Sequence, residues 1–402
     1  MEERTEERLR LMFVAGEDSG DAHAAALVRA LRERAPATHF ELFGAAGIKM
    51  REAGVEPTVR EDDLAIMGIV EVARALPRFL SAYRDLKRAA QERQPDAAIL
   101  VDWPDFNLPL ARALKRRGTR IIYYISPQLW AWRARRVRRV RRDVDLLLAI
   151  LPFEPAWYEA RGVRHVEFVG HPLVGEVRPR WTRVEFCARH RLDPTRPVVA
   201  LLPGSRRKEF ERILPPMLDA ARQLARTHAG AQFVLALGAN RTAEEAERLI
   251  AASEPAASSL LRERLRLVRH ETREALAAAD AAAVASGTAT LEAALTSTPM
   301  VVVYKESAIN WHVLGSLINV EHYGLVNLIA GARLATELMQ NELTGKRLAA
   351  ELGALLDAEQ NARVRARLRE ATARLGAGGA SLRAADAVLR AVRAWKQEQP
   401  QS

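Results

Sequence analysis

Short apolar runs alternate with amphipathic stretches along most of the chain, and few folds are compatible with this repetition. Such runs are typical of strands buried in a parallel sheet, and the stretches between them have the spacing of helices that cover the sheet. The strand candidates of the first half are Leu11–Ala15, Phe40–Phe43, Ala97–Val101, Arg120–Ile125, Leu146–Leu151 and Val166–Val169. Those of the second half are Val198–Leu202, Gln232–Leu237, Leu265–Val268, Ala281–Val284 and Met300–Tyr304. The pattern predicts an α/β protein with two Rossmann-like domains.

The repetition is interrupted once between the halves and stops near the C-terminus. Residues 171–196 contain scattered prolines and are typical of a linker. After Thr344, apolar residues recur at helical spacing to about Lys396. We therefore expect an N-terminal domain over residues 1–172, a C-terminal domain over 173–344, and a helical tail over 345–402 that packs back on an N-terminal domain. Open parallel sheets bind ligands at the carboxyl ends of their strands, so we expect functional loops there, facing a cleft between the domains.

Three further features of the sequence limit the classes of protein that the chain can belong to. They are its cysteine content, its first residues and its net charge. A single cysteine, Cys187, excludes a disulfide framework and a multi-cysteine metal site. The charged start, MEERTEERLR, is unlike a signal peptide, and no apolar run approaches the ~20 residues of a membrane span. These features predict a soluble or peripheral protein of a reducing compartment. The net charge of +11 indicates an anionic partner, either nucleic acid, acidic lipid or a phosphorylated substrate, although the Arg and Ala bias would also follow from a GC-rich genome.

Two loops of the first half carry carboxylates directly after a strand. In the loop 16–21, GEDSGD, glycines relax the turn and Ser19 or Asp21 can cap the next helix, so it suits either an acceptor-binding loop or an ordinary turn. In the loop 102–107, DWPDFN, the carboxylate of Asp102 can act as general base on a sugar hydroxyl if burial raises its pKa. Asp105 and Asn107 can contact a ligand or simply cap the following helix.

An aromatic and arginine-rich segment follows the strand 120–125. Two tryptophans, Trp130 and Trp132, cannot both face inward on a helix, which favours an apolar groove or an interface. Seven arginines then lie within 133–142, with Val137 and Val140 at helical spacing. This stretch reads as an amphipathic basic helix, which faces either solvent or a membrane surface.

Two loops of the second half are suited to phosphate. The first contains Gly204, Ser205 and Arg206, in which the glycine lets the backbone approach a ligand and the arginine supplies a fixed charge. The second begins Ser286-Gly287-Thr288 at the predicted start of a helix, which suits a diphosphate, and Glu292 lies one turn further on the same face. A carboxylate there can accept hydrogen bonds from both ribose hydroxyls, or it can be an ordinary acidic residue of the first helical turn.

The motifs taken in order resemble those of the lipid-A-disaccharide synthase family. The matching stretches are GEDSGD at Gly16–Asp21, IMGIVEV at Ile66–Val72, DWPDFN at Asp102–Asn107, YYISPQLWAWR at Tyr123–Arg133, LPFE at Leu151–Glu154, FVGHPL at Phe168–Leu173, LLPGSRRKE at Leu201–Glu209, ASGTATLE at Ala285–Glu292, PMVVVYK at Pro299–Lys305 and LVNLIAG at Leu325–Gly331. The resemblance implies the GT-B glycosyltransferase fold, often as a homodimer that exchanges its C-terminal segment.

The same resemblance implies a reaction and a set of site residues. The reaction joins UDP-2,3-diacylglucosamine to 2,3-diacylglucosamine 1-phosphate (lipid X) with inversion, releases UDP, and uses no metal or other cofactor. By motif, Asp102 is the general base. The acceptor side is implied to include Glu17, Ser19, Asp105 and Asn107. The UDP side is implied to include Gly204, Ser205, Arg206, Ser286, Gly287, Thr288, Glu292 and Asn327.

The resemblance also assigns the basic excess to a membrane partner. Both substrates are acylated and anionic, so we expect a cytoplasmic enzyme bound peripherally to the anionic inner face of the membrane, and no nucleic-acid partner. The stretch Ile66–Leu80, with Phe79, Leu80 and Tyr83, can contact acyl chains or form an ordinary core helix. The chain departs from the family pattern at Val326, where a proline is usual, and in loops near Gly44, Gly238 and Thr336. The alternatives are another UDP-sugar enzyme of this architecture, such as an epimerase, and a nucleic-acid-binding protein.

Overall fold

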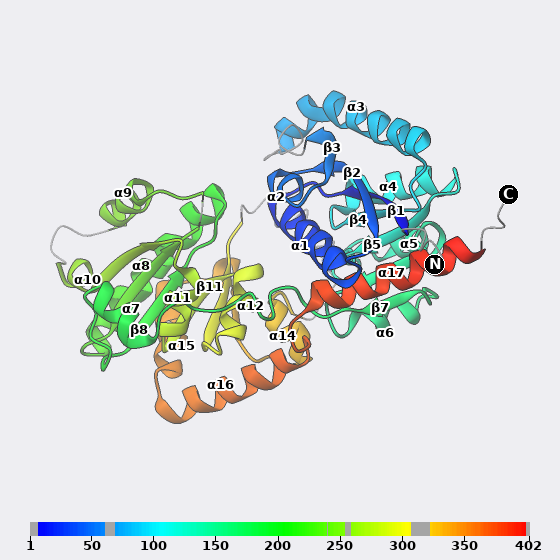
Figure 1. The fold of residues 1–402 in the computed structure, drawn as a ribbon. Helices are drawn as coiled ribbons and strands as arrows, with labels where there is room; N and C mark the ends of the chain where they lie inside the picture. The colour runs from blue at the N-terminus through cyan, green and yellow to red at the C-terminus, as the bar shows by residue number, and fades with distance from the viewer. Residues whose placement is uncertain (1–6, 61–68, 239, 254–258, 307–321, 399–402) are drawn as a thin grey trace. The chain divides into compact units, whose positions relative to one another are not determined.

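The chain forms two compact units in the computed structural model, which describes residues 7–60, 69–238, 240–253, 259–306 and 322–398 (Figure 1). Unit 1 consists of Met1–Val174 and Leu375–Ser402, and unit 2 consists of Gly175–Arg374. Each unit is a parallel sheet with helices on both faces, as the alternating pattern predicts. None of the described helices has the length and apolar character needed to span a bilayer.

Unit 1 contains a seven-stranded parallel sheet of order β3-β2-β1-β4-β5-β6-β7. Its strands are β1 (Arg8–Val14), β2 (His39–Ala46), β3 (Glu56–Arg60), β4 (Ala97–Val101), β5 (Arg120–Tyr124), β6 (Leu146–Ala149) and β7 (Val166–Phe168). Alternate residues of β1 enter different cores, since Leu11 and Phe13 lie on one face and Met12 and Val14 on the other. The first face packs against α1 (Asp18–Arg34), α2 (Ile48–Glu52) and α17 (Ala380–Glu398). The second packs against α3 (Ile69–Arg93), α4 (Pro104–Lys115), α5 (Val137–Asp143) and α6 (Glu154–Glu159).

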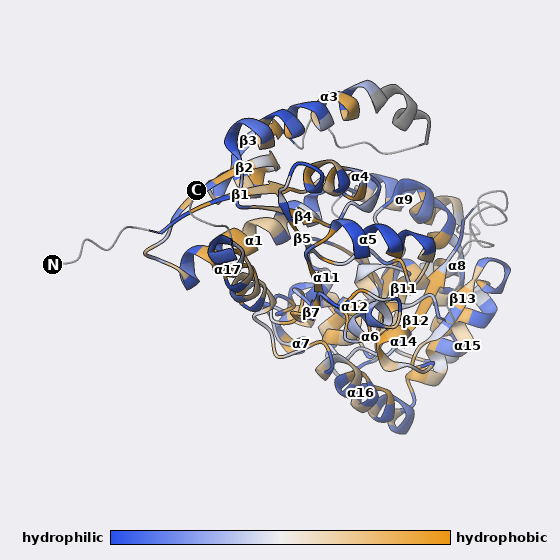
Figure 2. Ribbon diagram, turned by 90° about the vertical axis from the view of Figure 1, so that its right-hand side faces the viewer, coloured by the Kyte–Doolittle hydropathy of each residue, from blue (hydrophilic) through white to orange (hydrophobic). Residues whose placement is uncertain are grey.

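Unit 2 contains a six-stranded parallel sheet of order β10-β9-β8-β11-β12-β13. Its strands are β8 (Val198–Leu202), β9 (Gln232–Leu237), β10 (Leu265–Arg269), β11 (Ala281–Ala285), β12 (Met300–Tyr304) and β13 (Thr336–Met339). One face packs against α8 (Arg207–Thr227), α9 (Ala243–Ser253), α10 (Ser259–Arg264) and α15 (Gly345–Leu355). The other packs against α7 (Arg183–Arg189), α11 (Thr272–Ala278), α12 (Thr288–Leu295), α14 (Leu325–Ala330) and α16 (Ala358–Ala373). The central strands are apolar on both faces, and β11 and β12 are orange in Figure 2.

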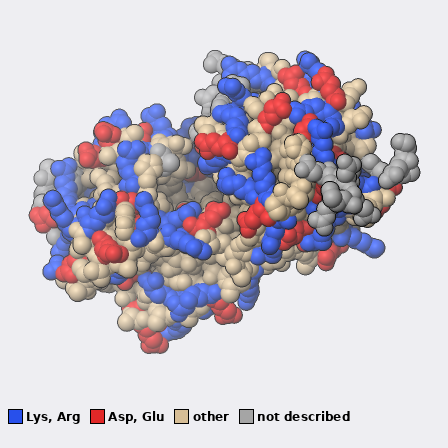
Figure 3. All heavy atoms as spheres, viewed as in Figure 1, with Lys and Arg blue, Asp and Glu red and all other residues tan. Residues whose placement is uncertain are grey.

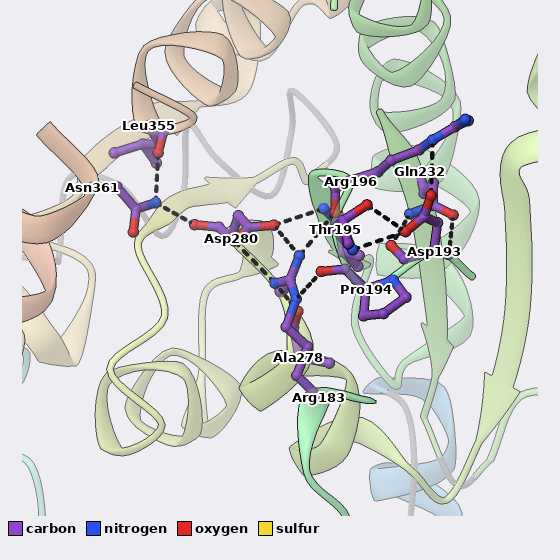
Figure 4. A network of polar contacts seen from close by, with 12 residues as sticks. Arg183, Asp193, Pro194, Thr195, Arg196, Gln232, Ala278, Asp280, Leu355 and Asn361 are labelled. Carbon is purple, nitrogen blue, oxygen red and sulfur yellow. Dashed lines mark hydrogen bonds and ion pairs between the residues drawn. The ribbon is translucent and has the colours of Figure 1, made fainter. Parts of the chain in front are cut away.

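The segment predicted as a linker, 171–196, is largely part of unit 2. It contains α7, whose Arg183 donates to both carboxylate oxygens of Asp280, at 3.0 and 2.9 Å. One of these oxygens also accepts from the amide of Val198 at 2.8 Å, at the amino end of β8 (Figure 4). This bidentate pair fixes the edge of the sheet opposite the functional loops. Beyond Val174, the segment predicted as a linker is therefore a folded part of unit 2.

The predicted helical tail divides between the units. Its helical character is as expected, but α15 and α16 pack within unit 2, where Asn361 of α16 donates to the carbonyl of Asp280 at 2.7 Å. Only α17 returns to unit 1, where it lies along α1 and buries residues such as Val388 and Val392 (Figure 1). The chain therefore crosses between units after Val174 and again after Arg374, instead of after residues 172 and 344.

Candidate active site

The candidate acceptor loops follow adjacent strands of unit 1. In the order β1-β4-β5-β6, all strands are parallel, so the loops after them emerge at one edge of the sheet. These loops begin at Ala15, Asp102, Ile125 and Ile150. The topology thus brings together the motifs that the sequence places after strands of the first half.

The loop after β4 is held in an unusual backbone conformation. Asp102 and Trp103 both have left-handed φ angles, 48° and 47°, which side-chain-bearing residues seldom adopt. Asn107 secures this turn, because its Nδ2 donates to the carbonyls of Val101 at 3.2 Å and Asp102 at 2.8 Å. The hydroxyl of Tyr123 donates to the same carbonyl of Asp102 at 2.5 Å. Strained backbone persists where surrounding bonds determine it, and it is common at functional sites.

The carboxyl group of Asp102 has a pKa close to neutral pH. Burial, and secondly the charge of Glu17, raise the pKa of Asp102 to about 6, while a bond from the Trp103 backbone partly opposes them. A general base is most effective when its pKa lies near the working pH. The sequence-based condition for Asp102 as a base, a pKa raised by burial, is therefore met.

The loop after β1 meets Asp102 from the neighbouring strand. Glu17 and Ser19 are exposed at this edge, as an acceptor-binding role would require. Asp21 instead is buried, and its carboxylate accepts from the amides of Lys49 at 2.8 Å and Met50 at 3.2 Å. It therefore caps α2 and not α1, whose N-cap residue Glu17 makes no side-chain capping bond.

Gly16 is the point at which the two loops touch. A Cβ atom on Gly16 would lie 2.2 Å from ring atoms of Trp103, whose indole stacks on Phe106 with ring centroids 4.2 Å apart. No side chain larger than hydrogen fits there unless the indole moves. The sequence motif contains this glycine because of the close approach of Trp103.

We expect Gly16→Ala to displace Trp103 and destabilise the loop that carries Asp102. Overpacking of this kind costs about 1–3 kcal/mol, so the melting temperature should fall by several degrees and turnover with it. Gly20→Ala is the matched control. Gly20 lies within α1, and a Cβ atom there would be 3.5 Å from the methyl group of Ala15, which is an ordinary van der Waals contact. Equal melting curves and activities for the two variants would contradict this role of Gly16.

The loop after β5 is anchored by two residues of α6, Glu154 and Tyr158, to which the sequence motifs assigned no role. Glu154 is fully buried, and its carboxylate accepts from Trp130 Nε1 at 3.1 Å and from the amide of Leu151 at 2.9 Å. Burial raises the pKa of Glu154, and these bonds oppose that rise. The hydroxyl of Tyr158 donates to the carbonyl of Pro127 at 2.6 Å. The LPFE motif, which follows β6 and places a carboxylate at the first residue of α6, was the available signal for this anchor.

The predicted basic helix is shorter than expected. A 3-10 turn, η2 (Ala134–Arg136), precedes α5, which begins only at Val137. α5 is hydrophilic blue in Figure 2, and Val140 is its buried apolar contact. Trp130 and Trp132 lie in the irregular segment before η2 and are both partly buried, so neither is on a helix.

The candidate nucleotide loops follow β8 and β11, which are adjacent in unit 2. Gly204 has a left-handed φ of 100°, and a Cβ on it would lie 3.5 Å from the methyl of Ala285, so the two loops are neighbours. Ser205 packs on Gly238, where an added Cβ would lie 2.9 Å from the serine Cβ. Ser205 and Arg206 are exposed at this edge, as a phosphate-binding role would require.

Both charged side chains predicted to hold UDP already have partners within unit 2. The guanidinium of Arg206 is 3.0 Å from the carboxylate of Glu209, and its side chain remains 79% exposed. Glu292 accepts from Arg273 Nε at 3.0 Å. Gly287 and Thr288 are exposed at the start of α12, and Ser286 Oγ donates to the carbonyl of Tyr323 at 3.4 Å. Arg206, Gly287 and Thr288 are thus exposed to solvent, while Arg206 is paired with Glu209 and Glu292 with Arg273.

Asn327 lies inside unit 2, which does not fit its predicted contact with UDP. It is fully buried, its Oδ1 accepts from the amides of Leu334 and Ala335, both at 2.8 Å, and its Nδ2 donates to Glu337 at 2.8 Å. Glu337 also accepts from the amide of Gly324 at 2.8 Å. The pair supports the backbone of residues 323–324, beside Ser286. Asn107 of unit 1, also fully buried, has the same kind of supporting role.

This fold is shared with a class of proteins whose solved structures include a putative epimerase and a glycosyltransferase. The structure aligns with a putative UDP-N-acetylglucosamine 2-epimerase from Listeria monocytogenes at a TM-score of 0.66 and 14% identity, covering 98% of each chain. It aligns with the calicheamicin glycosyltransferase CalG4 at a TM-score of 0.58 and 15% identity, covering 97% of this chain and 99% of that one. The expected GT-B type fold is confirmed.

Sequence comparison identifies the family within that class. The family described as lipid-A-disaccharide synthetase matches residues 11–391. The lipid-A-disaccharide synthase of Trichlorobacter lovleyi is 42% identical over 381 residues, which cover 94% of this chain and 97% of that protein. The chain belongs to the lipid-A-disaccharide synthase family, and it is a hexosyltransferase, as the motifs predicted.

Proposed function

We propose that this enzyme transfers 2,3-diacylglucosamine from UDP to the 6-hydroxyl of 2,3-diacylglucosamine 1-phosphate, with inversion at the anomeric carbon. The observation that carries the proposal is the carboxylate of Asp102, whose pKa is raised to about 6 on a loop fixed by Asn107 and Tyr123. In the reaction, the hydroxyl oxygen attacks the anomeric carbon and its proton passes to Asp102. The bond from that carbon to the diphosphate oxygen breaks, and its electron pair leaves with UDP.

Unit 2 supplies the donor site in this proposal. The exposed loops 204–206 and 286–288 hold the diphosphate, with amides at the start of α12 and the guanidinium of Arg206 as donors. Arg206 is the countercharge to the leaving diphosphate. Glu292 lies one turn into α12. Its carboxylate accepts hydrogen bonds from the ribose hydroxyls, and these partly replace the hydrogen bond from Arg273.

We expect Arg206→Ala to weaken UDP binding by about 10- to 100-fold, because a hydrogen bond to a charged group contributes about 1.5–3 kcal/mol. Arg207→Ala is a matched control, since Arg207 is similarly exposed, at 74%, and pairs with Glu211 on α8. Isothermal titration calorimetry with free UDP measures both. Unchanged affinity in Arg206→Ala, or an equal loss in Arg207→Ala, would count against this assignment.

The acylated parts of both substrates require an apolar contact, and we propose that α3 supplies it beside Asp102. Phe79 packs near Trp103 and Phe106, with ring centroids 5.9 and 6.3 Å apart, and Leu80 is 46% exposed. Tyr83 meets Phe106 edge-on. The first part of the predicted acyl stretch, residues 66–68, lies outside the described residues. Figure 3 shows basic and acidic side chains mixed over one face, and the net charge of +11 favours binding to an anionic bilayer surface.

A transfer assay tests the proposal directly. Incubation of the enzyme with UDP-2,3-diacylglucosamine and 2,3-diacylglucosamine 1-phosphate should give an acylated disaccharide 1-phosphate and UDP. An epimerase of the same fold would convert the UDP-sugar without an acceptor. Absence of disaccharide, with the UDP-sugar consumed or untouched, would reject the proposed reaction. Sedimentation of the purified enzyme tests the homodimer that the family resemblance implies.

A further inference from the structure

Two arginines of unit 1 converge on one exposed carboxylate oxygen next to the candidate catalytic loop. Arg133 Nη1 lies 2.9 Å and Arg136 Nη1 lies 2.6 Å from the same oxygen of Asp105. Asp105 is 61% exposed, and the arginines are 41% and 22% exposed. Surface ion pairs of this kind contribute little to stability, so stability alone does not account for the cluster.

The cluster is built from two neighbouring loops. Asp105 belongs to the first turn of α4 after β4, and the arginines belong to the segment after β5, which pairs with β4. The guanidinium of Arg133 lies 4.2 Å from the ring centroid of Trp132, a cation–π contact that restricts its position. Arg136 is the last residue of η2, directly before α5. The two guanidinium groups are therefore arranged before any ligand binds.

The carboxylate of the cluster and Asp102 belong to the same loop, since Asp105 follows Asp102 by three residues after β4. Burial raises the pKa of the Tyr123 hydroxyl well above its usual value, and the charges of Asp102, Asp105 and Arg136 all act on it. That hydroxyl donates to the backbone carbonyl of Asp102. An anion held by the two arginines would thus lie at the same edge of the sheet as the group that receives the acceptor's proton.

We propose that Arg133 and Arg136 form the binding subsite for the anomeric phosphate of the acceptor, with Asp105 as a placeholder that the phosphate displaces. This inference rests on the proposed function, in which the acceptor is a sugar 1-phosphate. A phosphate monoester presents three acceptor oxygens and up to two charges, so it binds two guanidinium groups more strongly than one exposed carboxylate does. The reacting 6-hydroxyl is one sugar ring away from that phosphate. The subsite therefore selects acceptors that are phosphorylated and orients them toward Asp102.

The test compares phosphorylated and dephosphorylated 2,3-diacylglucosamine as acceptors for wild type, Arg133→Gln and Arg136→Gln. Wild type should prefer the phosphorylated acceptor. Each variant should raise KM for that acceptor at least ~10-fold, with KM for the dephosphorylated acceptor and for the UDP-sugar nearly unchanged. Arg34→Gln is the matched control, since Arg34 pairs with Asp386 at 3.2 Å at the far end of α1.

The outcomes separate the subsite from its alternatives. If wild type forms no disaccharide from either acceptor, the proposed function fails before the subsite is tested. If wild type is active but the variants keep its preference for phosphate, the subsite is rejected. Binding to vesicles of anionic phospholipid distinguishes the other source of phosphate. Loss of vesicle binding in the variants, with unchanged acceptor preference, would assign the arginines to lipid headgroups instead.

Discussion

Replacing Asp102 with asparagine should lower turnover at least ~100-fold, the usual scale for removal of a general base, and should leave the fold intact. The substitution keeps the shape of the side chain but removes its ability to take a proton. The backbone carbonyl of Asp102, which Asn107 and Tyr123 hold, is unaffected. Steady-state transfer rates at saturating substrates measure the effect. Asp386→Asn is the control, because Asp386 is a half-exposed carboxylate on α17.

The pH dependence of the wild-type enzyme should report the same carboxylate. Because the pKa of Asp102 is raised to about 6, kcat/KM should fall as the pH decreases through about 6, where the base becomes protonated. An ordinary aspartate would keep its activity down to about pH 4. The Asp102→Asn variant should lack this limb. Near-normal turnover in that variant, or a limb near pH 4, would reject Asp102 as the base.

Raising the pH through about 6 should increase activity and, through the same carboxylate, lower the stability of the folded protein. The pKa of Asp102 is higher in the folded protein, at about 6, than the ordinary value of 3.8, so the folded state binds the proton more tightly. The stabilisation of the folded state by this bound proton is fully present below pH 3.8 and is lost as the pH rises through about 6. At pH 7.5 the buried charge costs up to about 3 kcal/mol, at ~1.4 kcal/mol per pKa unit. Asp102→Asn should therefore melt at a higher temperature than wild type at pH 7.5, and the gain should vanish near pH 4.

The sequence predicted the central strands of both sheets and missed one edge strand of each. Central strands such as β4 and β8 are apolar on both faces, so their pattern is visible in the chain. β3 (EPTVR) and β13 (TELM) are edge strands with polar residues, which is how proteins limit edge pairing. The tail was expected to pack on an N-terminal domain, but helical spacing did not show that α15 and α16 stay in unit 2 and that α17 returns to unit 1, because it shows that a face is buried and does not identify the surface that buries it.

The sequence places its candidate residues in loops after strands, and it does not show which of their side chains a ligand can reach. In unit 1 the loops after β1, β4, β5 and β6 lie at one edge of the sheet, because its strands are parallel. The motif residues Asn107 and Asn327 look like ligand contacts, yet both are fully buried and bonded to backbone carbonyls or amides. Arg133 and Arg136 look like part of a solvated basic stretch, yet they converge on Asp105. The direction of a side chain depends on φ angles and neighbours that one sequence does not encode locally.

Replacing Asn327 with aspartate should be the most destabilising of these substitutions, although it changes one atom type. In the native protein, Nδ2 of Asn327 donates to the carbonyl of Ala335 at 2.9 Å and to the carboxylate of Glu337 at 2.8 Å. An aspartate would place an oxygen against both acceptors, and a second negative charge beside Glu337 in a buried site. A buried charge without a partner costs about 3–5 kcal/mol. Asn341→Asp, on the exposed turn η3 (Gln340–Glu342), is the isosteric control.

The damage should be local enough to follow by amide hydrogen exchange. Glu337 holds the amides of Tyr323 and Gly324, and Asn327 holds those of Leu334 and Ala335. These four amides should lose protection in Asn327→Asp, and the affinity for UDP should fall with them, because Ser286 Oγ donates to the carbonyl of Tyr323. Unchanged protection would show that the site accommodates the carboxylate.

Acid should partly rescue Asn327→Asp, and this separates charge repulsion from the simple loss of hydrogen bonds. Two carboxylates in contact share a proton, so the pKa of the pair rises and protection should return as the pH falls toward 5. The Asn327→Ala variant also loses the bonds to Leu334, Ala335 and Glu337, but it introduces no charge, so its defect should not improve over the same pH range. Equal pH responses of the two variants would mean that Asn327 acts only through its hydrogen bonds. A rescue confined to the aspartate variant would show that a neutral side chain is needed at position 327, next to the carboxyl group of Glu337.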